Sequence, residues 1–240
     1  MLSLILLIVT GLLIGASCGQ MPMEGSLLLA SVNSSPVSGR SADLLDIVDV
    51  VDTNIESACA KSKLLLVSDQ RVISQSHLSD REIPNTIHVT TRSRCLPQAF
   101  ADTIQQWKNK FSSYSVLVHN DEAVYRLLEQ SLAEFPHLSL ALQCRHSSMA
   151  SLTDVWRAVL LYKYGGIYTD LDNTPTDLLV QAMTNLKTSD TAVFVVEEMG
   201  YLSQYFVAAP PRHSLVFIWV HTLLNRLLTT TDIDHQYVPA

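Results

Sequence analysis

Segments with the hydrophobic pattern of strands and of helices alternate along the chain from about residue 60 onward. Strands are predicted at 64–67, 86–89, 115–118, 191–196 and 205–209. Helices are predicted at 97–110, from Asn120 or Asp121 as far as Pro136, from Ser151 or Thr153 as far as Gly165, and at 214–228. This alternation is typical of an α/β domain built on a mostly parallel sheet. The β-branched run 191–196 is expected to be a central strand.

The first eighteen residues differ from the rest because they carry no charged side chain and are mostly apolar. Residues 1–18 are therefore predicted to be a signal peptide that is removed or a signal anchor that is kept, and only the second would leave a membrane anchor at the amino terminus. Residues 19–60, with scattered Ser, Gly and Pro, are predicted to be a stem or linker, and 61–240 the main domain. We expect the protein in the secretory pathway, in the Golgi or ER lumen, as a single-pass membrane protein or a secreted one.

Composition excludes one broad class of protein and argues against another. Apolar residues make up 48% of the chain, which excludes a disordered protein. The formal net charge is −7, from 16 basic and 23 acidic residues, which argues against a nucleic-acid partner. Cysteines occur at 18, 59, 95 and 144 without metal-binding spacing. Among Cys59, Cys95 and Cys144 the sequence leaves open which two form a disulfide, and whether all three are simply buried.

Four charged residues near the middle of the chain are candidates for chemistry. Asp154 and Arg157 are three positions apart, so they share one face of the predicted helix. Asp170 and Asp172 follow a short strand-like step, in a loop that can turn both carboxylates toward one point. Divalent cations such as Mg²⁺ and Mn²⁺ prefer oxygen ligands, and a pair of carboxylates leaves coordination positions for water and phosphate. The loop is therefore a candidate for a metal site that also binds phosphate; an ordinary turn is the alternative, because Asp-x-Asp is common in turns.

The Asp-x-x-Arg helix, the Tyr-Gly-Gly-Ile-Tyr step at 164–168 and the Asp-Leu-Asp loop at 170–172 resemble a known site. It is the sugar-nucleotide site of glycosyltransferases whose sugar-binding region contains a DxD motif. This family includes α-1,6-mannosyltransferases, inositol-phosphoceramide mannosyltransferases and α-1,4-galactosyltransferases. Residues 83–88, 114–120 and 204–213 resemble further stretches of the family, so the resemblance covers about residues 80–225.

The resemblance implies a GT-A-like, Rossmann-type nucleotide-sugar-binding domain with a mostly parallel central sheet. It implies a glycosyltransferase that moves a hexose from GDP-mannose or a UDP-hexose to a glycan or glycolipid, with retention of anomeric configuration. The catalytic residues would be Asp170 and Asp172, which would hold Mn²⁺ (or Mg²⁺) and the donor diphosphate. Asp154 and Arg157 would bind the sugar hydroxyls. Tyr168 would line the donor pocket, and His88 would lie near the nucleotide.

Two alternatives remain open at this stage. A phosphatase of the haloacid-dehalogenase type would use Asp170 as nucleophile and Asp172 as general acid, but this leaves Asp154 and Arg157 without a role. A non-catalytic lumenal protein of the same fold would bind the sugar nucleotide without turnover. The family resemblance implies a histidine-containing segment beyond the position of Ala240, which His221 or His235 would have to replace, so a truncated or inactive relative is also an alternative.

Overall fold

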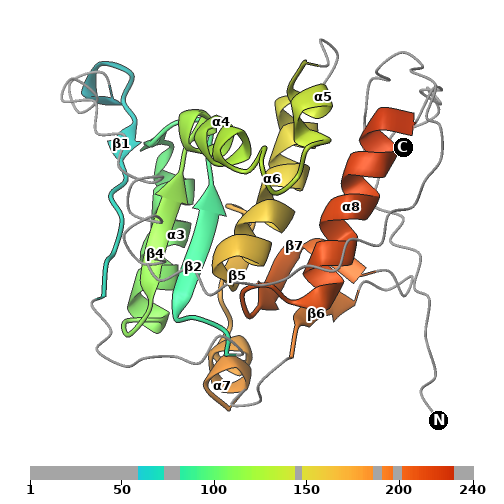
Figure 1. The fold of residues 1–240 in the computed structure, drawn as a ribbon. Coiled ribbons are helices and arrows are strands. Elements are labelled where there is room, and N and C mark those ends of the chain that lie inside the picture. Colours follow the sequence, from blue (N-terminus) through green and yellow to red (C-terminus); the bar gives the residue numbers. More distant parts are fainter. Residues whose placement is uncertain (1–58, 73–81, 144–147, 186–190, 197–201, 230–240) are drawn as a thin grey trace, which may run out of the picture.

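A computed structural model describes residues 59–72, 82–143, 148–185, 191–196 and 202–229, and the predicted signal segment lies outside these ranges. Five strands form the main sheet in the order β4-β2-β5-β7-β6 (Figure 1). The strands are β2 (Thr86–Thr90), β4 (Ser115–His119), β5 (Gly166–Thr169), β6 (Val193–Val196) and β7 (Leu202–Ala209). β2 pairs in parallel with β4 and β5, whereas β7 runs antiparallel to both β5 and β6. Only β7 is reversed, which confirms the predicted α/β fold with a mostly parallel sheet.

Helices cover both faces of this sheet. They are α3 (Gln98–Lys110), α4 (Asp121–Gln130), α5 (Leu138–Gln143), α6 (Met149–Tyr164), α7 (Asp177–Asn185) and α8 (Ser214–Thr229). One hydrophobic cluster joins α4, α5, α6 and α8 to the sheet, and a second joins α3 and α7 to the opposite face (Figure 1). α6 lies at the centre of the first cluster and buries residues on almost every side. A helix that is buried on most sides carries apolar residues on most sides, as α6 does.

Most predicted elements are confirmed, with differences at their ends. Ser148, not Ser151 or Thr153, caps α6, and its hydroxyl accepts a hydrogen bond from the Ser151 amide. α4 ends at Gln130, well before Pro136, because the Ser131 hydroxyl bonds the Leu127 carbonyl and the helix gives way to turns. At the start of α6 the Ser148 hydroxyl satisfies a free amide of the first turn, and at the end of α4 the Ser131 hydroxyl bonds a carbonyl of the last turn.

The expectation of a central strand at 191–196 is wrong. β6 (Val193–Val196) pairs only with β7 and forms the edge of the sheet, and Val196 is 62% exposed. The β-branched composition fits an edge strand equally well. Such residues favour any pleated, half-buried strand, whatever its position in the sheet. β7, predicted at 205–209, begins earlier and takes the inner position.

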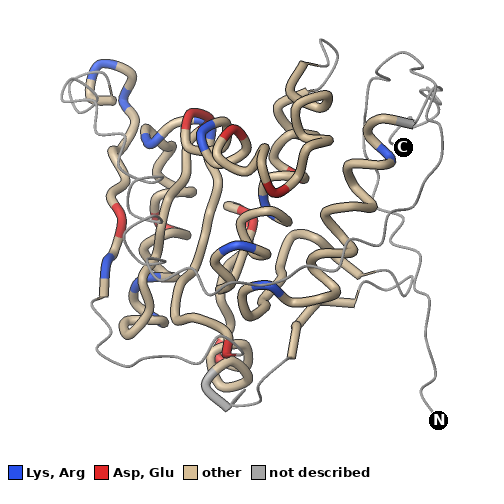
Figure 2. The backbone as a smooth tube through the Cα atoms, viewed as in Figure 1, with Lys and Arg blue, Asp and Glu red and all other residues tan. Residues whose placement is uncertain are grey.

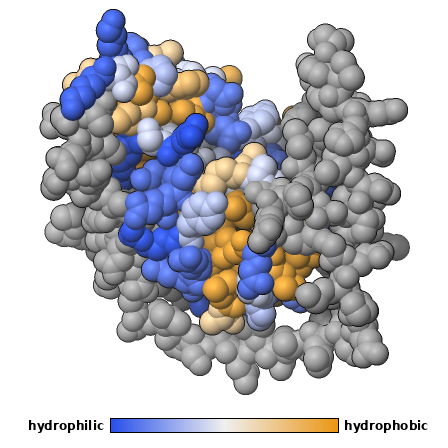
Figure 3. Space-filling view, turned by 90° about the horizontal axis from the view of Figure 1, so that it is seen from above, coloured by the Kyte–Doolittle hydropathy of each residue, from blue (hydrophilic) through white to orange (hydrophobic). Residues whose placement is uncertain are grey.

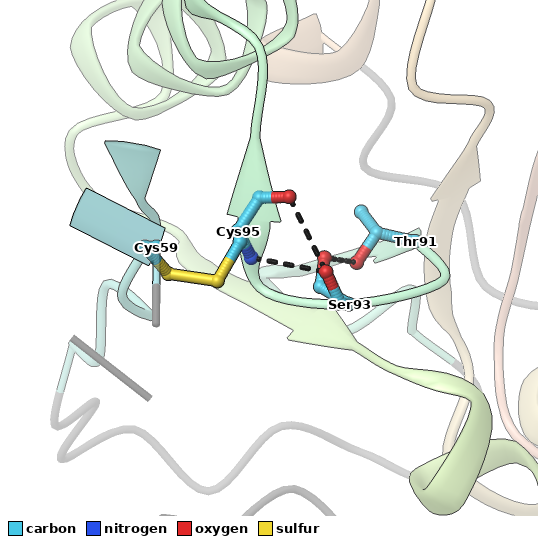
Figure 4. Close-up of a disulfide and its surroundings, with 4 residues drawn as sticks. All are labelled: Cys59, Thr91, Ser93 and Cys95. Carbon is cyan, nitrogen blue, oxygen red and sulfur yellow. Dashed lines mark hydrogen bonds between the residues drawn. A yellow bond between two sulfur atoms is a disulfide. The ribbon is translucent and has the colours of Figure 1, made fainter. Parts of the chain in front are cut away.

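A disulfide joins the start of the described chain to the connection between β2 and α3. Cys59 bonds Cys95, 36 positions later, beside a two-stranded antiparallel sheet of β1 (Leu65–Leu66) and β3 (Cys95–Leu96) (Figure 4). The predicted strand at 64–67 therefore lies outside the main sheet. Cys18 and Cys144 lie outside the described residues. The described helices include none with the length and apolar character needed to cross a membrane.

Candidate active site

A sharp reversal between α6 and β5 brings the charged residues together. Gly165 and Gly166 both have positive φ, 65° and 99°, which favours glycine. A Cβ atom on Gly166 would lie 2.6 Å from the Thr86 carbonyl oxygen. From the reversal, ten residues of helix back to Asp154 and five of strand forward to Asp170 each span about 15 Å. The turn therefore places Asp154 and Asp170 at the same level.

Arg157 joins three separate parts of the protein. Its Nη2 lies 2.7 Å from Asp154 Oδ1, and its Nη1 lies 3.5 Å from Asp170 Oδ1. Nη1 also donates a hydrogen bond of 2.9 Å to the Gln204 carbonyl of β7. Residues of both charges lie close together where α6 passes β5 (Figure 2). The structure thus brings three of the four predicted charged residues into direct contact.

Tyr168 lies under this group and is almost fully buried. It is 1% exposed, and the Arg157 guanidinium carbon lies 4.6 Å from the centroid of its ring. Its hydroxyl donates to Asp170 Oδ1 at 2.6 Å, and Thr90 Oγ1 lies 3.3 Å from the same hydroxyl. Because the single phenolic hydrogen goes to the carboxylate, Thr90 is the donor to Tyr168. These contacts engage Asp170 Oδ1, while Oδ2 has no bond among the described residues.

Asp172 lies in the turn after β5 and its side chain is exposed. It makes no hydrogen bond or ion pair within the described part of the chain. Asn173, next to it, closes the turn: its amide donates to the Asp170 carbonyl at 3.3 Å, and its Nδ2 donates to the Tyr205 carbonyl at 3.0 Å. The structure therefore places Asp172 at the same turn as Asp170, directed to solvent.

His88 is the register partner of Tyr168 in the sheet, but its ring nitrogens bond other residues. It is fully buried, and its Nε2 lies 3.2 Å from the Gly165 carbonyl while its Nδ1 lies 3.1 Å from Nε2 of His119. A carbonyl only accepts, so His88 Nε2 carries the proton and His119 Nε2 donates to His88 Nδ1. Both ring nitrogens of His88 are thus bound by protein groups. The position of His88 near a nucleotide stays a prediction. Neither of its ring nitrogens is free to bind one in this structure.

His221 does not lie with the group either. Its ring packs against Phe217 and Phe135, at centroid distances of 4.3 and 5.8 Å, on the side of α8. His235 lies outside the described residues.

Burial sets the electrostatics of the site. The pKa of Asp154 is raised, chiefly because burial penalises its charged form; the Arg157 cation opposes this shift and Asp170 adds to it. Burial also raises the pKa of Tyr168 far above its usual value, so this hydroxyl remains a donor. Arg157 therefore stabilises negative charge on Asp154 in a place where water does little.

The carboxylates of Asp170 and Asp172 are suited to a divalent cation that also takes phosphate oxygens as ligands. Among the described residues, no three His, Cys, Asp or Glu side chains come together as a metal cluster. Asp170 Oδ2 and the exposed Asp172 carboxylate bond no other group among the described residues. Two such ligands suit a cation that completes its sphere with phosphate oxygens and water. Seen from above relative to Figure 1, the described surface shows a hydrophilic band beside an apolar area (Figure 3).

Comparison with known proteins agrees with this geometry. Residues 97–192 match the model of the family described as the glycosyltransferase sugar-binding region containing DXD motif. This stretch is therefore similar to the sugar-binding region of that glycosyltransferase family, and the mixed α/β fold is consistent with a GT-A-like domain. It is also 25% identical over 164 residues to inositol phosphoceramide mannosyltransferase 1 of Schizosaccharomyces pombe. The matched part is 65% of this chain and 45% of the relative, so the chain spans about half of the relative's length.

Several residues that complete the site were not found from the sequence. Thr90, Trp107 and the Gln204 carbonyl reach it from β2, α3 and β7. No spacing rule points to them, because they are distant in sequence and are brought near only by the strand order. Asn173 adjoins the Asp-x-Asp loop, and its amide side chain in a turn was the one available signal.

Proposed function

We propose that this chain is a hexosyltransferase that uses a nucleotide-sugar donor and a divalent cation, Mn²⁺ or Mg²⁺. The observation that carries the proposal is the contact of Asp154, Arg157 and Asp170 at the end of β5, inside the residues that match the DXD family. Sugar transfer in general is supported by the family and by the relative. The donor, the acceptor and the stereochemistry are part of the proposal.

Each residue is assigned a role that its contacts support. Asp170 Oδ2 and Asp172 would hold the cation and, through it, the donor diphosphate. When bound, the cation stabilises the negative charge that develops on the departing diphosphate. Asp154, held ionised by Arg157, would accept hydrogen bonds from sugar hydroxyls and so orient the sugar ring. Retention of anomeric configuration is proposed from the family resemblance, and no general base is assigned.

The activity named for the relative suggests which compounds to test first. Because it is a mannosyltransferase acting on inositol phosphoceramide, GDP-mannose is the first donor to test and a glycolipid the first acceptor. UDP-glucose and UDP-galactose are the comparison donors. We further propose a location in the secretory pathway, in the Golgi or ER lumen, supported by the Cys59–Cys95 disulfide, since such bonds persist in oxidising compartments. The proposed signal or anchor segment, 1–18, lies outside the described residues.

Calorimetry and turnover assays with these donors, with and without Mn²⁺, test the proposal. A transferase binds one donor in the presence of Mn²⁺ and transfers or slowly hydrolyses its sugar. Binding without turnover would make the chain a sugar-nucleotide-binding protein. Cleavage of a generic phosphate monoester through a phosphoenzyme would instead support the phosphatase alternative. Failure to bind any of the three donors with Mn²⁺ would contradict the proposal.

The Asp172→Asn variant tests the metal assignment directly. Turnover is expected to fall at least about 100-fold, since the variant loses a negatively charged ligand. The free energy of unfolding should change by less than about 0.5 kcal/mol, because the side chain is exposed. Asp177→Asn, at an exposed acid on α7, is the matched control and should retain wild-type turnover. Wild-type turnover and Mn²⁺ dependence in Asp172→Asn would disprove the assignment.

A further inference from the structure

The turn that carries both aspartates is fastened to the sheet on one side. The Tyr205 carbonyl of β7 accepts two hydrogen bonds from it, one from the Asp170 amide at 2.9 Å and one from Asn173 Nδ2 at 3.0 Å. Asn173 Nδ2 also lies 3.4 Å from Thr169 Oγ1. The Asn173 side chain therefore bonds the end of the turn to β7, at the same carbonyl that bonds the Asp170 amide at the start of the turn.

The same turn is fastened to a helix on the other side. Trp107 of α3 donates its indole Nε1–H to the Asn173 carbonyl at 2.8 Å. Trp107 is 1% exposed and stacks against Phe111 and Phe206, at centroid distances of 5.3 and 6.4 Å. Because large aromatic neighbours fix the indole, its N–H is a rigid donor. Asn173 is thus bound through its side chain to β7 and through its carbonyl to α3.

Between these attachments, the two intervening side chains point in opposite ways. Leu171 is partly buried against the cluster on the α3 face, whereas Asp172 is exposed. An exposed Asp in an unattached turn would sample many directions, and ordering it on binding would cost free energy. A turn held at Asn173 and packed at Leu171 has already lost most of that freedom.

We propose that Asn173 and Trp107 are positioning residues that hold Asp172 in the direction from which it binds the metal and diphosphate. This inference rests on the proposed function. Neither residue touches the donor in this proposal, and both act through the backbone of the turn. Removing either side chain is therefore expected to lower the affinity for the metal while the protein stays folded.

The experiment compares four variants of the full chain. Trp107→Phe removes the indole donor and keeps an aromatic ring, and Asn173→Ala removes the side-chain donor. Trp219→Phe is the matched control, since Trp219 is also buried but its Nε1 has no hydrogen-bond partner among the described residues. Asp172→Asn is the reference for loss of the metal ligand. Each protein is titrated with Mn²⁺ in the presence of GDP, and separately of UDP, by calorimetry, and its thermal unfolding midpoint is recorded.

Trp107→Phe and Asn173→Ala are each expected to weaken Mn²⁺ binding roughly five- to tenfold, the size expected from one hydrogen bond. Trp219→Phe should bind as wild type. If both test variants bind Mn²⁺ as wild type while Asp172→Asn does not, the positioning role is disproved and the metal site stands. If Asp172→Asn also binds as wild type, the proposed function itself fails. Should Trp107→Phe not fold, Asn173→Ala alone decides the question.

Discussion

At the scale of single residues, Arg157 is the group on which the site depends most. It contacts Asp154, Asp170 and the Gln204 carbonyl, and it lies over the ring of Tyr168. A guanidinium presents several donors in one plane, so it can serve these partners at once. An ammonium group is a compact point charge and cannot reproduce the same set of contacts. Charge alone therefore does not explain this position.

Arg157→Lys tests that argument, because it keeps the charge and removes the planar donor set. We expect kcat/KM to fall about 100-fold and the free energy of unfolding to fall by about 2 kcal/mol, since buried charge-assisted hydrogen bonds are lost. Steady-state kinetics and urea unfolding measure the two effects. Arg126→Lys, at an exposed ion pair with Glu122, is the control and should change stability by less than about 0.5 kcal/mol. Equal behaviour of the two variants would refute the argument.

Tyr168→Phe separates the hydroxyl from the ring. The ring under Arg157 remains, while Asp170 Oδ1 loses its 2.6 Å donor and Thr90 loses its acceptor. We expect stability to fall by about 1 kcal/mol and kcat to fall about tenfold, since Asp170 Oδ1 then keeps only its 3.5 Å contact with Arg157. Tyr114→Phe is the control, because the Tyr114 hydroxyl makes no hydrogen bond within the described residues. A variant with unchanged kcat would show that the hydroxyl does not orient Asp170.

At the scale of elements, the reversal at Gly165 and Gly166 decides whether α6 and β5 can bring Asp154 and Asp170 to the same level. Gly166→Ala would place a Cβ atom 2.6 Å from the Thr86 carbonyl oxygen at a φ of 99°. Backbone must move to relieve this contact, so we expect the free energy of unfolding to fall by about 3 kcal/mol or more. Thermal unfolding checks the prediction. An unfolding midpoint within one or two degrees of wild type would mean that the reversal tolerates a side chain.

The same scale shows which features a sequence can predict. Asp154, Arg157 and Asp170 were predictable because helix spacing and one tight turn relate them within seventeen positions of the chain. β2 and α3 were predictable because their patterns are local. The edge position of β6 was not, because it depends on β7 entering the sheet between β5 and β6. Thr90 and Trp107 were missed for the same reason, since only the assembled sheet brings them to the turn.

At the scale of the whole molecule, a buried polar chain links two strands and the central helix. It runs from His119 of β4 to His88 of β2 and on to the Gly165 carbonyl at the end of α6. Trp156 of α6 packs edge-on against His119, with ring centroids 5.0 Å apart. Both imidazoles must be neutral for this chain of donors and acceptors to hold, because a charged His88 would present a second donor to His119.

That requirement makes the stability of the fold depend on pH. Burial lowers the pKa of His88 to about 4, and burial together with the neighbouring His88 and Arg94 lowers that of His119 well below 6.5. In the unfolded chain both titrate near about 6.5. The unfolded state therefore binds more protons from about pH 6.5 down to pH 4, so stability rises with pH across this window and is lost as pH falls. Asp154, whose pKa is raised, has the opposite sign.

We expect the free energy of unfolding to fall by about 3 kcal/mol between pH 6.5 and pH 5, about half of it from each histidine. Urea unfolding across this range measures the loss. His119→Gln keeps a donor for His88 Nδ1 and removes one titrating group, so its loss over the same range should be about half that of wild type. Because Asp154 is present in both proteins, its opposing effect cancels in the comparison. Identical pH profiles for the two proteins would show that His119 is not buried as a neutral group.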